Sequence, residues 1–288
     1  MISCCMISWN EAQTIDLSLK SLVGFVDEVV IADNGSFDGT QQIARDCLER
    51  TGLKGEVVDV DAMTLGQSRL ASWRKCRGDW ILLIDSNLVL SDAVKMELRE
   101  VQKHQSKIGC VQSLNLMGDY GHYFTPLPFH SHHVTFFHRD AVTWRNDLDR
   151  PTRKQGTRRV NVKPFAVNLS RVRPAWRCWY RGEPFDPRFF KKGTLDGYRT
   201  ETNRQDKWVM AKKYGSIVEY VEAKSGQTLE DVKRVAPEWY LGQLNQYAER
   251  LTESYLKGLP EVIRKERKSP RYELQYRGKT ISGRHPEL

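Results

Sequence analysis

Strand-like apolar runs and helical patterns alternate over the first 116 residues, and this alternation constrains the fold more than any other feature. The predicted strands are residues 2–8, 26–32, 55–60, 80–84 and 108–116. Helical spacing begins near Ile15, and further helices are predicted at 41–50 and at 66–76. Ser91-Asp92 is predicted to cap another helix that runs to about His104. Such alternation is typical of an α/β fold with a mostly parallel sheet that helices cover on both faces.

The pattern changes after Leu116. The sequence predicts a loop over 118–128, a pair of strands at 134–137 and 141–144, a helix at 206–214 and a strand at 217–221. Residues 229–264 are predicted to be mostly helical, and the last stretch, 265–288, is predicted to be a loosely packed polar tail.

Charge is concentrated in one part of the chain. The formal net charge is +9, and residues 150–177 hold nine Lys and Arg residues with no Asp or Glu. A block of one sign indicates an anionic partner or a solvated face. Six cysteines without a repeated spacing, no signal-peptide pattern and no apolar stretch of membrane-spanning length lead us to expect a cytoplasmic protein.

Polar clusters follow three of the predicted strands directly: Asn10-Glu11, Asp33-Asn34 and Asp85-Ser86-Asn87. Because ligands bind at the carboxyl ends of the strands in open α/β sheets, we expect these clusters to line one crevice.

Three stretches carry a family resemblance: MISWNEAQTIDLSLKSL, VDEVVIADNGSFDGT and GDWILLIDSNLVLSD. In order and spacing they resemble the opening motifs of family 2 glycosyltransferases. The resemblance implies a GT-A fold and transfer of a sugar from a nucleotide diphosphate sugar, with a UDP-sugar favoured. It also implies a nucleotide-sugar-binding half at 1–120 and an acceptor-binding, catalytic half at 121–225, leaving a helical C-terminal extension at 226–288.

The resemblance assigns the donor pocket to residues at the strand ends. Asp33 is expected to accept a hydrogen bond from a uracil-type imide, although an acid that shapes the following turn is the alternative. Asn10 has helix capping as its alternative, and for Asp38 a capping and a ligand role are equally plausible. The expected donor-binding set is Ser8, Asn10, Glu11, Asp33, Asn34, Asp85 and Ser86.

The third motif also suggests a metal site, because Mg²⁺ and Mn²⁺ prefer carboxylate oxygens beside substrate phosphates. The family usually has Asp-x-Asp, whereas this chain has Asp85-Ser86-Asn87. Three explanations stay open: phosphates and Asp85 hold the metal, another side chain completes its shell, or metal-dependent transfer is lost. Asp79 is interpreted as structural, paired with Arg77 or a backbone donor.

His138 is the candidate third ligand. It belongs to a histidine cluster with His122, His130, His132 and His133, which we interpret mainly as a surface or acceptor-site loop.

The acceptor side is assigned to the second half of the chain. The resemblance makes Asp206 the candidate general base, with Asp196 and Glu201 as competitors and a first-turn helix acid as the alternative role. It also places acceptor binding in the basic block. The favoured acceptor is a nucleic acid or another anionic polymer, followed by a protein or glycan and then a lipid phosphate. The expected contacts are Arg158, Arg159, Arg171, Arg173, Trp176 and Trp179.

Two other classes remain open beside an active, inverting transferase. One is a catalytically silent binding module of the same fold, for which Asn87 would be the mark of lost activity. The other is a basic nucleic-acid-binding protein that binds a nucleotide without transfer. A nucleotidyltransferase is less favoured, because Trp9-Asn10-Glu11 does not supply the Gly-rich basic loop that it would need.

Overall fold

The computed structural model describes most of the first 172 residues and several later stretches. The described residues are 1–62, 64–103, 107–118, 120–125, 129–145, 150–172, 222, 228, 230, 248–267, 272–276 and 279–283. The chain divides into two compact units, Met1–Arg171 with Glu249–Ser269, and Val172–Ala248 with Pro270–Leu288. Residues 249–269 belong to the first unit.

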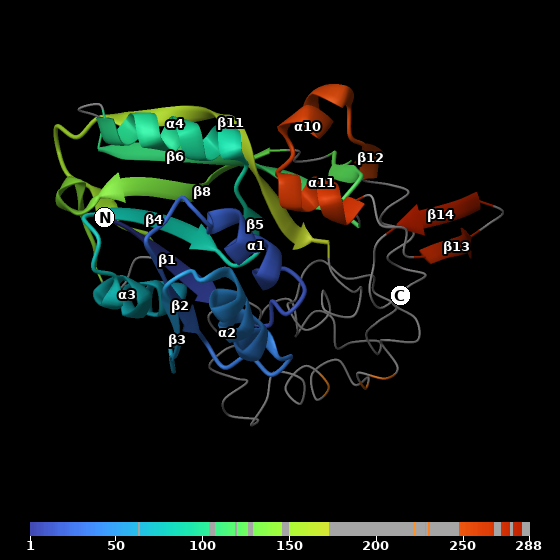
Figure 1. Ribbon diagram of the computed structural model, residues 1–288, viewed down its shortest axis with the longest axis horizontal. Coiled ribbons are helices and arrows are strands. Elements are labelled where there is room, and N and C mark those ends of the chain that lie inside the picture. The colour runs from blue at the N-terminus through green and yellow to red at the C-terminus, as the bar shows by residue number, and fades with distance from the viewer. Residues whose placement is uncertain are drawn as a thin grey trace, which may run out of the picture. The chain divides into compact units, whose positions relative to one another are not determined.

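A ten-stranded sheet forms the centre of the first unit (Figure 1). Eight strands follow the order β12-β7-β6-β8-β4-β1-β2-β3, and β11 pairs with β6 and with β5. Strands β1 to β4 are parallel, β11 is parallel to β6, and β8 lies antiparallel between β4 and β6. The predicted, mostly parallel α/β sheet is confirmed. The strands are β1 Ile2–Ser8, β2 Glu28–Asp33, β3 Gly55–Asp59, β4 Trp80–Asp85, β5 Leu88–Val89, β6 Ile108–Met117, β7 His122–Phe124, β8 Phe129–His138, β11 Arg159–Arg171 and β12 Ala248–Arg250.

Helices cover both faces of this sheet, as the sequence predicts. They are α1 Ile15–Leu22, α2 Thr40–Thr51, α3 Leu65–Lys75 and α4 Asp92–Lys103. Because side chains alternate along a strand, Cys4 of β1 joins the core under α1, α2 and α4, while Cys5 joins the core that includes Trp73 of α3. The predicted cap of α4 is confirmed, since the Ser91 hydroxyl accepts from the Val94 N–H at 3.3 Å.

Three predictions about the region after Leu116 are wrong. The expected loop 118–128 contains β7, which pairs with β6. The expected strand pair does not form: β8 pairs with β4 and β6, and β9 (Val142–Thr143) pairs with β10 (Thr152–Arg153). His130, His132 and His133 therefore lie on a strand inside the sheet and not in a loop. Local alternation indicates a strand but does not show which strand pairs with it.

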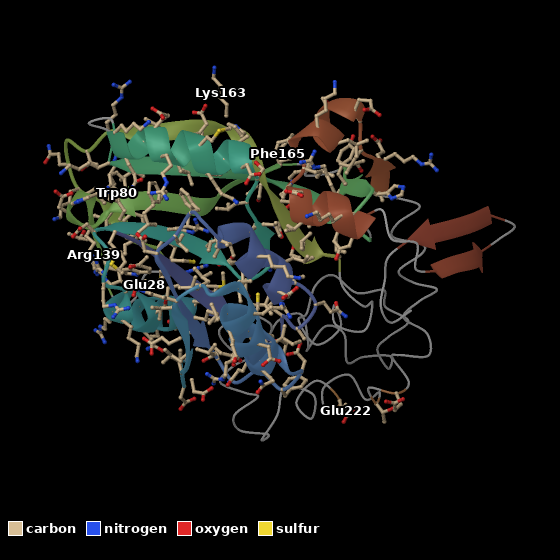
Figure 2. The ribbon with its side chains drawn as sticks, in the orientation of Figure 1. Glu28, Trp80, Arg139, Lys163, Phe165 and Glu222 are labelled. Carbon is tan, nitrogen blue, oxygen red and sulfur yellow. The ribbon has the colours of Figure 1, made fainter. Side chains whose placement is uncertain are left out.

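Much of the basic block, residues 150–177, forms a regular strand, β11, that the sequence analysis did not predict. Val162, Ala166, Val167 and Leu169 of this strand are buried, whereas Arg159 and Lys163 are exposed. Lys163 extends away from the ribbon beside α4 (Figure 2). The density of positive charge masked the apolar face of a strand.

The returning segment 249–267 carries two short helices, α10 (Glu253–Gly258) and α11 (Glu261–Arg267). The Leu251 N–H donates to the Gly121 carbonyl at 2.9 Å, and the ring of Tyr255 packs edge-on against Tyr123 and Phe129. In the second unit, β13 (Tyr272–Tyr276) and β14 (Lys279–Gly283) form an antiparallel hairpin where a polar tail was predicted. The predicted helix 206–214, the predicted strand 217–221 and half of the predicted helical stretch 229–264 lie outside the described residues.

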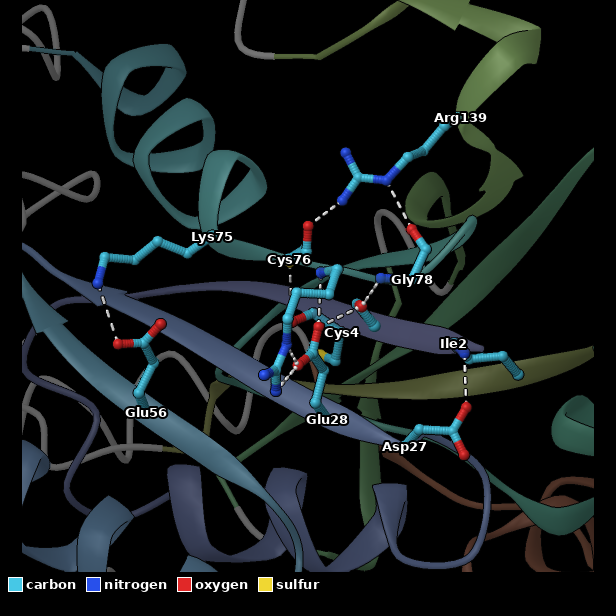
Figure 3. Close-up of polar contacts among 11 residues, drawn as sticks. Ile2, Cys4, Asp27, Glu28, Glu56, Lys75, Cys76, Gly78 and Arg139 are labelled. Atoms are coloured by element: carbon cyan, nitrogen blue, oxygen red, sulfur yellow. Dashed lines mark hydrogen bonds and ion pairs between the residues drawn. The ribbon is translucent and has the colours of Figure 1, made fainter.

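A buried carboxylate ties together the strand ends opposite the expected crevice (Figure 3). Glu28 accepts from the Ser3 hydroxyl at 2.6 Å and from the Arg77 backbone and guanidinium at 2.5–2.8 Å. Gly78 donates to Ser3 at 2.6 Å, and a Cβ on Gly78 would lie 2.7 Å from the Ser3 hydroxyl oxygen. Arg77 therefore binds Glu28 and not Asp79, which contradicts one of the two partners that the sequence suggested for Asp79.

Glu28→Gln tests how much this network contributes to stability. Burial opposes ionisation of Glu28, but the hydrogen bonds from Ser3 and Arg77 hold its pKa below the usual range. We expect the free energy of unfolding at pH 7 to fall by about 1–3 kcal/mol. The difference from wild type should shrink as the pH falls below about 4, because the stabilisation is lost when Glu28 takes up a proton in the folded state. Chemical denaturation at several pH values measures it.

Glu56→Gln is the matched control. Glu56 forms an exposed ion pair with Lys75 at 3.0 Å, so its loss should change the free energy of unfolding by less than about 1 kcal/mol at any pH. Equal losses in both variants would contradict a special role for Glu28.

Candidate active site

Polar residues meet at the carboxyl ends of the parallel strands. Ser8 of β1 is in register with Asp33 of β2, which is in register with Asp59 of β3. Asp85 of β4 is in register with Ile7, one residue before Ser8. The structure thus brings together, along one edge of the sheet, the three polar clusters that the sequence places after separate strands.

Asp33 is buried and is held by its own turn. Its carboxylate accepts from the Ser36 N–H at 2.8 Å, from the Ser36 hydroxyl at 2.6 Å and from Gln41 Nε2 at 2.9 Å. These bonds support the turn-shaping interpretation. They also leave capacity for a ligand, since two carboxylate oxygens offer about four acceptor positions.

The loop after β1 is fastened to the loop after β2. Asn10 is fully buried with φ +52°, its N–H donates to the Ser36 hydroxyl at 2.7 Å, and its Oδ1 accepts from the Phe37 N–H at 2.9 Å. Asn10 does not cap α1, because the N-cap of that helix is Thr14. Asp38 accepts from the Thr40 N–H at 3.1 Å and from the Ala12 N–H at 3.2 Å, so it also joins the two loops.

Asn34 and two serines complete this edge. Asn34 Oδ1 accepts from the Ala62 N–H at 2.9 Å, which orients its amide. Ser86 is buried, and its N–H donates to the Ile7 carbonyl at 3.3 Å. Within the described part of the chain, the buried hydroxyl of Ser8 has no hydrogen-bond partner. Buried hydroxyls are normally paired, so this one suits contact with a polar ligand.

Asp85 forms an ion pair that the sequence analysis missed. The guanidinium of Arg69, on α3, lies 2.8 Å from Asp85 Oδ1, and the two side chains are 4% and 26% exposed. Arg69 lies on the buried face of α3 with Gly66, Ser68 and Ser72. The sequence feature that could have indicated this contact is a single arginine on a helix face that otherwise carries small residues.

Asn87 faces a carboxylate of the first loop. Asn87 Nδ2 lies 3.4 Å from Glu11 Oε1, and Glu11 is only 2% exposed. Glu11 Oε2 accepts from the Thr14 hydroxyl at 2.8 Å, and the Glu11 N–H donates to Thr40 Oγ1 at 2.7 Å. The amide at position 87 is thus a hydrogen-bond donor to a buried acid.

The oxygen atoms of Asp85 and Asn87 fit a hard divalent cation that also has ligands from outside the protein. The Asp85 carboxylate and the Asn87 amide oxygen are the oxygen types that Mg²⁺ and Mn²⁺ bind. No group of three or more His, Cys, Asp or Glu residues among those described is arranged to hold a metal.

His138 is excluded as a partner of Asp85 in this site. It is in register with Trp80, at the start of β4, whereas Asp85 ends that strand. Five residues of strand separate the two positions by roughly 16 Å, at about 3.3 Å per residue. His138 Nδ1 instead contacts Asp140 Oδ1 at 2.6 Å.

The expected acceptor residues fall in different places. Arg159, in register with Ile108 at the start of β6, lies with Arg158 at the opposite edge of the sheet from Asp85. These two arginines cannot line the same crevice, because the chain enters β11 at that far edge. Arg171 ends β11, in register with Met117 of β6. The other expected acceptor and catalytic residues lie outside the described residues: Arg173, Trp176, Trp179, Asp196, Glu201 and Asp206.

The model of the family described as "Glycosyl transferase family 2" matches residues 3–163. The chain belongs to glycosyltransferase family 2. The match spans all three strand-end clusters, so the polar edge is the candidate active site of a glycosyltransferase. Within the described residues, no helix has the length and apolar character needed to span a bilayer.

Two similar proteins come from species of Rickettsia. An uncharacterized glycosyltransferase of Rickettsia bellii is 34% identical over 106 residues, and one of Rickettsia felis is 35% identical over 100 residues. The matches cover 37% and 35% of this chain, and the chain spans only about a third of each relative, 34% and 33%.

Two solved structures are also similar. Staphylococcus aureus TarS 1–349 is 14% identical with a TM-score of 0.44, and the match covers 97% of this chain and 95% of that one. A mannosyltransferase of Pyrobaculum calidifontis, in complex with GDP-Man and Mn²⁺, is 15% identical with a TM-score of 0.45 and coverages of 85% and 73%.

Arg69→Met tests the buried ion pair. The substitution keeps the length of an unbranched side chain, makes it apolar and removes the guanidinium next to Asp85. Because Asp85 would keep a charge that is only partly screened by solvent, we expect the free energy of unfolding at pH 7 to fall by about 1–3 kcal/mol. The double variant R69M/D85N should lose less than R69M, as measured by urea denaturation.

Arg45→Met is the control, since Arg45 lies on the exposed face of α2. Its effect should stay within about 0.5 kcal/mol. A loss for R69M no larger than this would refute the structural importance of the pair.

Proposed function

We propose that this protein transfers a sugar from a nucleotide diphosphate sugar, most favourably a UDP-sugar, to an acceptor hydroxyl. The observation that carries the proposal is the alignment of Ser8, Asp33 and Asp85 along the carboxyl edge of the sheet in a family 2 chain. Ligands bind at this edge in open α/β sheets.

The donor base is proposed to bind at the end of β2. Asp33 is acceptor-only when it is ionised, so it suits the imide N–H of uracil. Its bonds to Ser36 and Gln41 hold it in place before the donor arrives, which lowers the entropic cost of binding. Ser8, Asn10 and Asn34 lie around it and support a polar nucleotide pocket.

A divalent cation, Mn²⁺ or Mg²⁺, is proposed to be held by Asp85 and Asn87 together with the donor diphosphate. Its chemistry would be to neutralise negative charge on the leaving diphosphate. The Mn²⁺ named in the Pyrobaculum calidifontis complex belongs to that protein, and it makes Mn²⁺ a reasonable first cation to test.

Asp206 is proposed as the general base that takes the proton of the acceptor hydroxyl, which implies inversion at the anomeric carbon. Asp196 and Glu201 are the competing candidates. The acceptor is proposed to be anionic, such as a nucleic acid, or a protein or glycan. With Arg158 and Arg159 at the far edge of the sheet, this part of the proposal relies on Arg171, Arg173, Trp176 and Trp179.

Release of the nucleotide diphosphate from UDP-sugars, with and without Mn²⁺, tests the donor assignment. Asp33→Asn should weaken UDP binding by about 10–100-fold, because it removes a charged acceptor of a hydrogen bond. Asp85→Asn should lower turnover by at least about 100-fold. Calorimetry measures the first effect and a UDP-release assay the second.

Asp46→Asn, at an exposed position on α2 that interacts with Gln42, is the control and should match wild type. Tight UDP binding with no release of UDP from any donor would favour the silent binding module over the enzyme.

Asp206→Asn and Asp196→Asn separate two of the candidate bases. Once an acceptor is identified, D206N should lower kcat by about 100–10,000-fold with little change in UDP affinity, because a general base contributes in the transition state and not in donor binding. A loss of kcat in D196N alone would move the base to Asp196.

A further inference from the structure

Asn87 contacts Glu11, and it stands where family 2 enzymes usually have an acid. Asn87 lies in the turn between β4 and β5, and Glu11 lies in the loop between β1 and α1. Their side chains meet with Asn87 Nδ2 3.4 Å from Glu11 Oε1. The contact joins two loops of the candidate active site that are 76 residues apart in the sequence.

Glu11 determines which way the amide faces. An ionised carboxylate only accepts hydrogen bonds, so the NH₂ group of Asn87 turns toward Glu11. The two polar atoms of an amide lie on opposite sides of its carbon, and the carbonyl oxygen therefore turns away from Glu11. Asn87 is thus oriented to present one neutral oxygen, while Glu11 carries the negative charge of the pair.

Glu11 is firmly held in this position. Its backbone N–H donates to Thr40 Oγ1 at 2.7 Å, and its Oε2 accepts from the Thr14 hydroxyl at 2.8 Å. The side chain is 2% exposed, so solvent screens its charge weakly. A carboxylate at position 87 would stand directly opposite a buried, fixed carboxylate, and like charges in such contact are destabilising.

We propose that Glu11 is a positioning residue of the cation–diphosphate site, supplying the charge that position 87 lacks and orienting the Asn87 carbonyl oxygen. The inference rests on the proposed function, because Glu11 and Asn87 can act on a cation only if the site binds the donor diphosphate. Partners in the shell around a metal ligand fix its orientation and typically change metal affinity by about 10–100-fold when they are removed.

A double-mutant cycle with E11Q, N87D and E11Q/N87D tests the pair in the full-length protein. Without metal, N87D should lower the urea midpoint of unfolding, because two carboxylates then face each other. E11Q should weaken Mn²⁺ binding in the presence of UDP by about 10–100-fold, measured by the EPR signal of free Mn²⁺. E11Q/N87D exchanges acid and amide between the two positions, and it should recover both the urea midpoint and most of the Mn²⁺ affinity.

Glu49→Gln, at an exposed position on α2, is the matched glutamate control and should leave both measurements unchanged. Additive effects in the cycle, or an E11Q variant with wild-type Mn²⁺ affinity, would overturn the inference. A wild-type protein that binds UDP but no Mn²⁺ would overturn the cation role of Glu11 alone. One that binds neither UDP nor another nucleotide would overturn the proposed function and this inference with it.

Discussion

The parallel pairing of β1 with β2 and β4 is the constraint on which the candidate site depends. This pairing aligns Ser8 with Asp33 and places Asp85 beside Ile7. A slip of one residue in either pairing would turn the polar strand ends to the other face of the sheet. At the opposite edge, the buried network around Glu28 links β1 and β2 to the start of β4 and so helps to hold the register.

Two carboxylates of the polar edge each have a side-chain partner from another segment of the chain. Asp85 is compensated by the guanidinium of Arg69, and Glu11 is bound by the neutral amide of Asn87. An isolated buried carboxylate would be costly, whereas a paired and hydrogen-bonded one is tolerated. The unusual Asn87 therefore has a local reason: the fold brings a fixed acid from the first loop to that position.

Much of the first half was predictable, because strands and helices there have strong periodicity and clear turn residues. The predicted strand that ends at Ser8 and the predicted cap at Ser91 both agree with the structure. The second half was predicted less well. β11 was not predicted, because its exposed cations, such as Lys163, obscured the apolar positions between them and the strand's end. The strands that pair with β8 cannot be specified by its local sequence. His138 was misassigned because its distance from Asp85 depends on the antiparallel direction of β8.

The sequence by itself determined the α/β class and the family, since both follow from local periodicity and from motifs within single strand–loop units. It also determined which polar residues end the strands. Only the tertiary structure decided their partners. The contacts of Arg69 with Asp85 and of Glu11 with Asn87 join segments that are far apart in the sequence. Such contacts depend on strand order, direction and register, which are set by the packing of the whole sheet and not by any one of its strands.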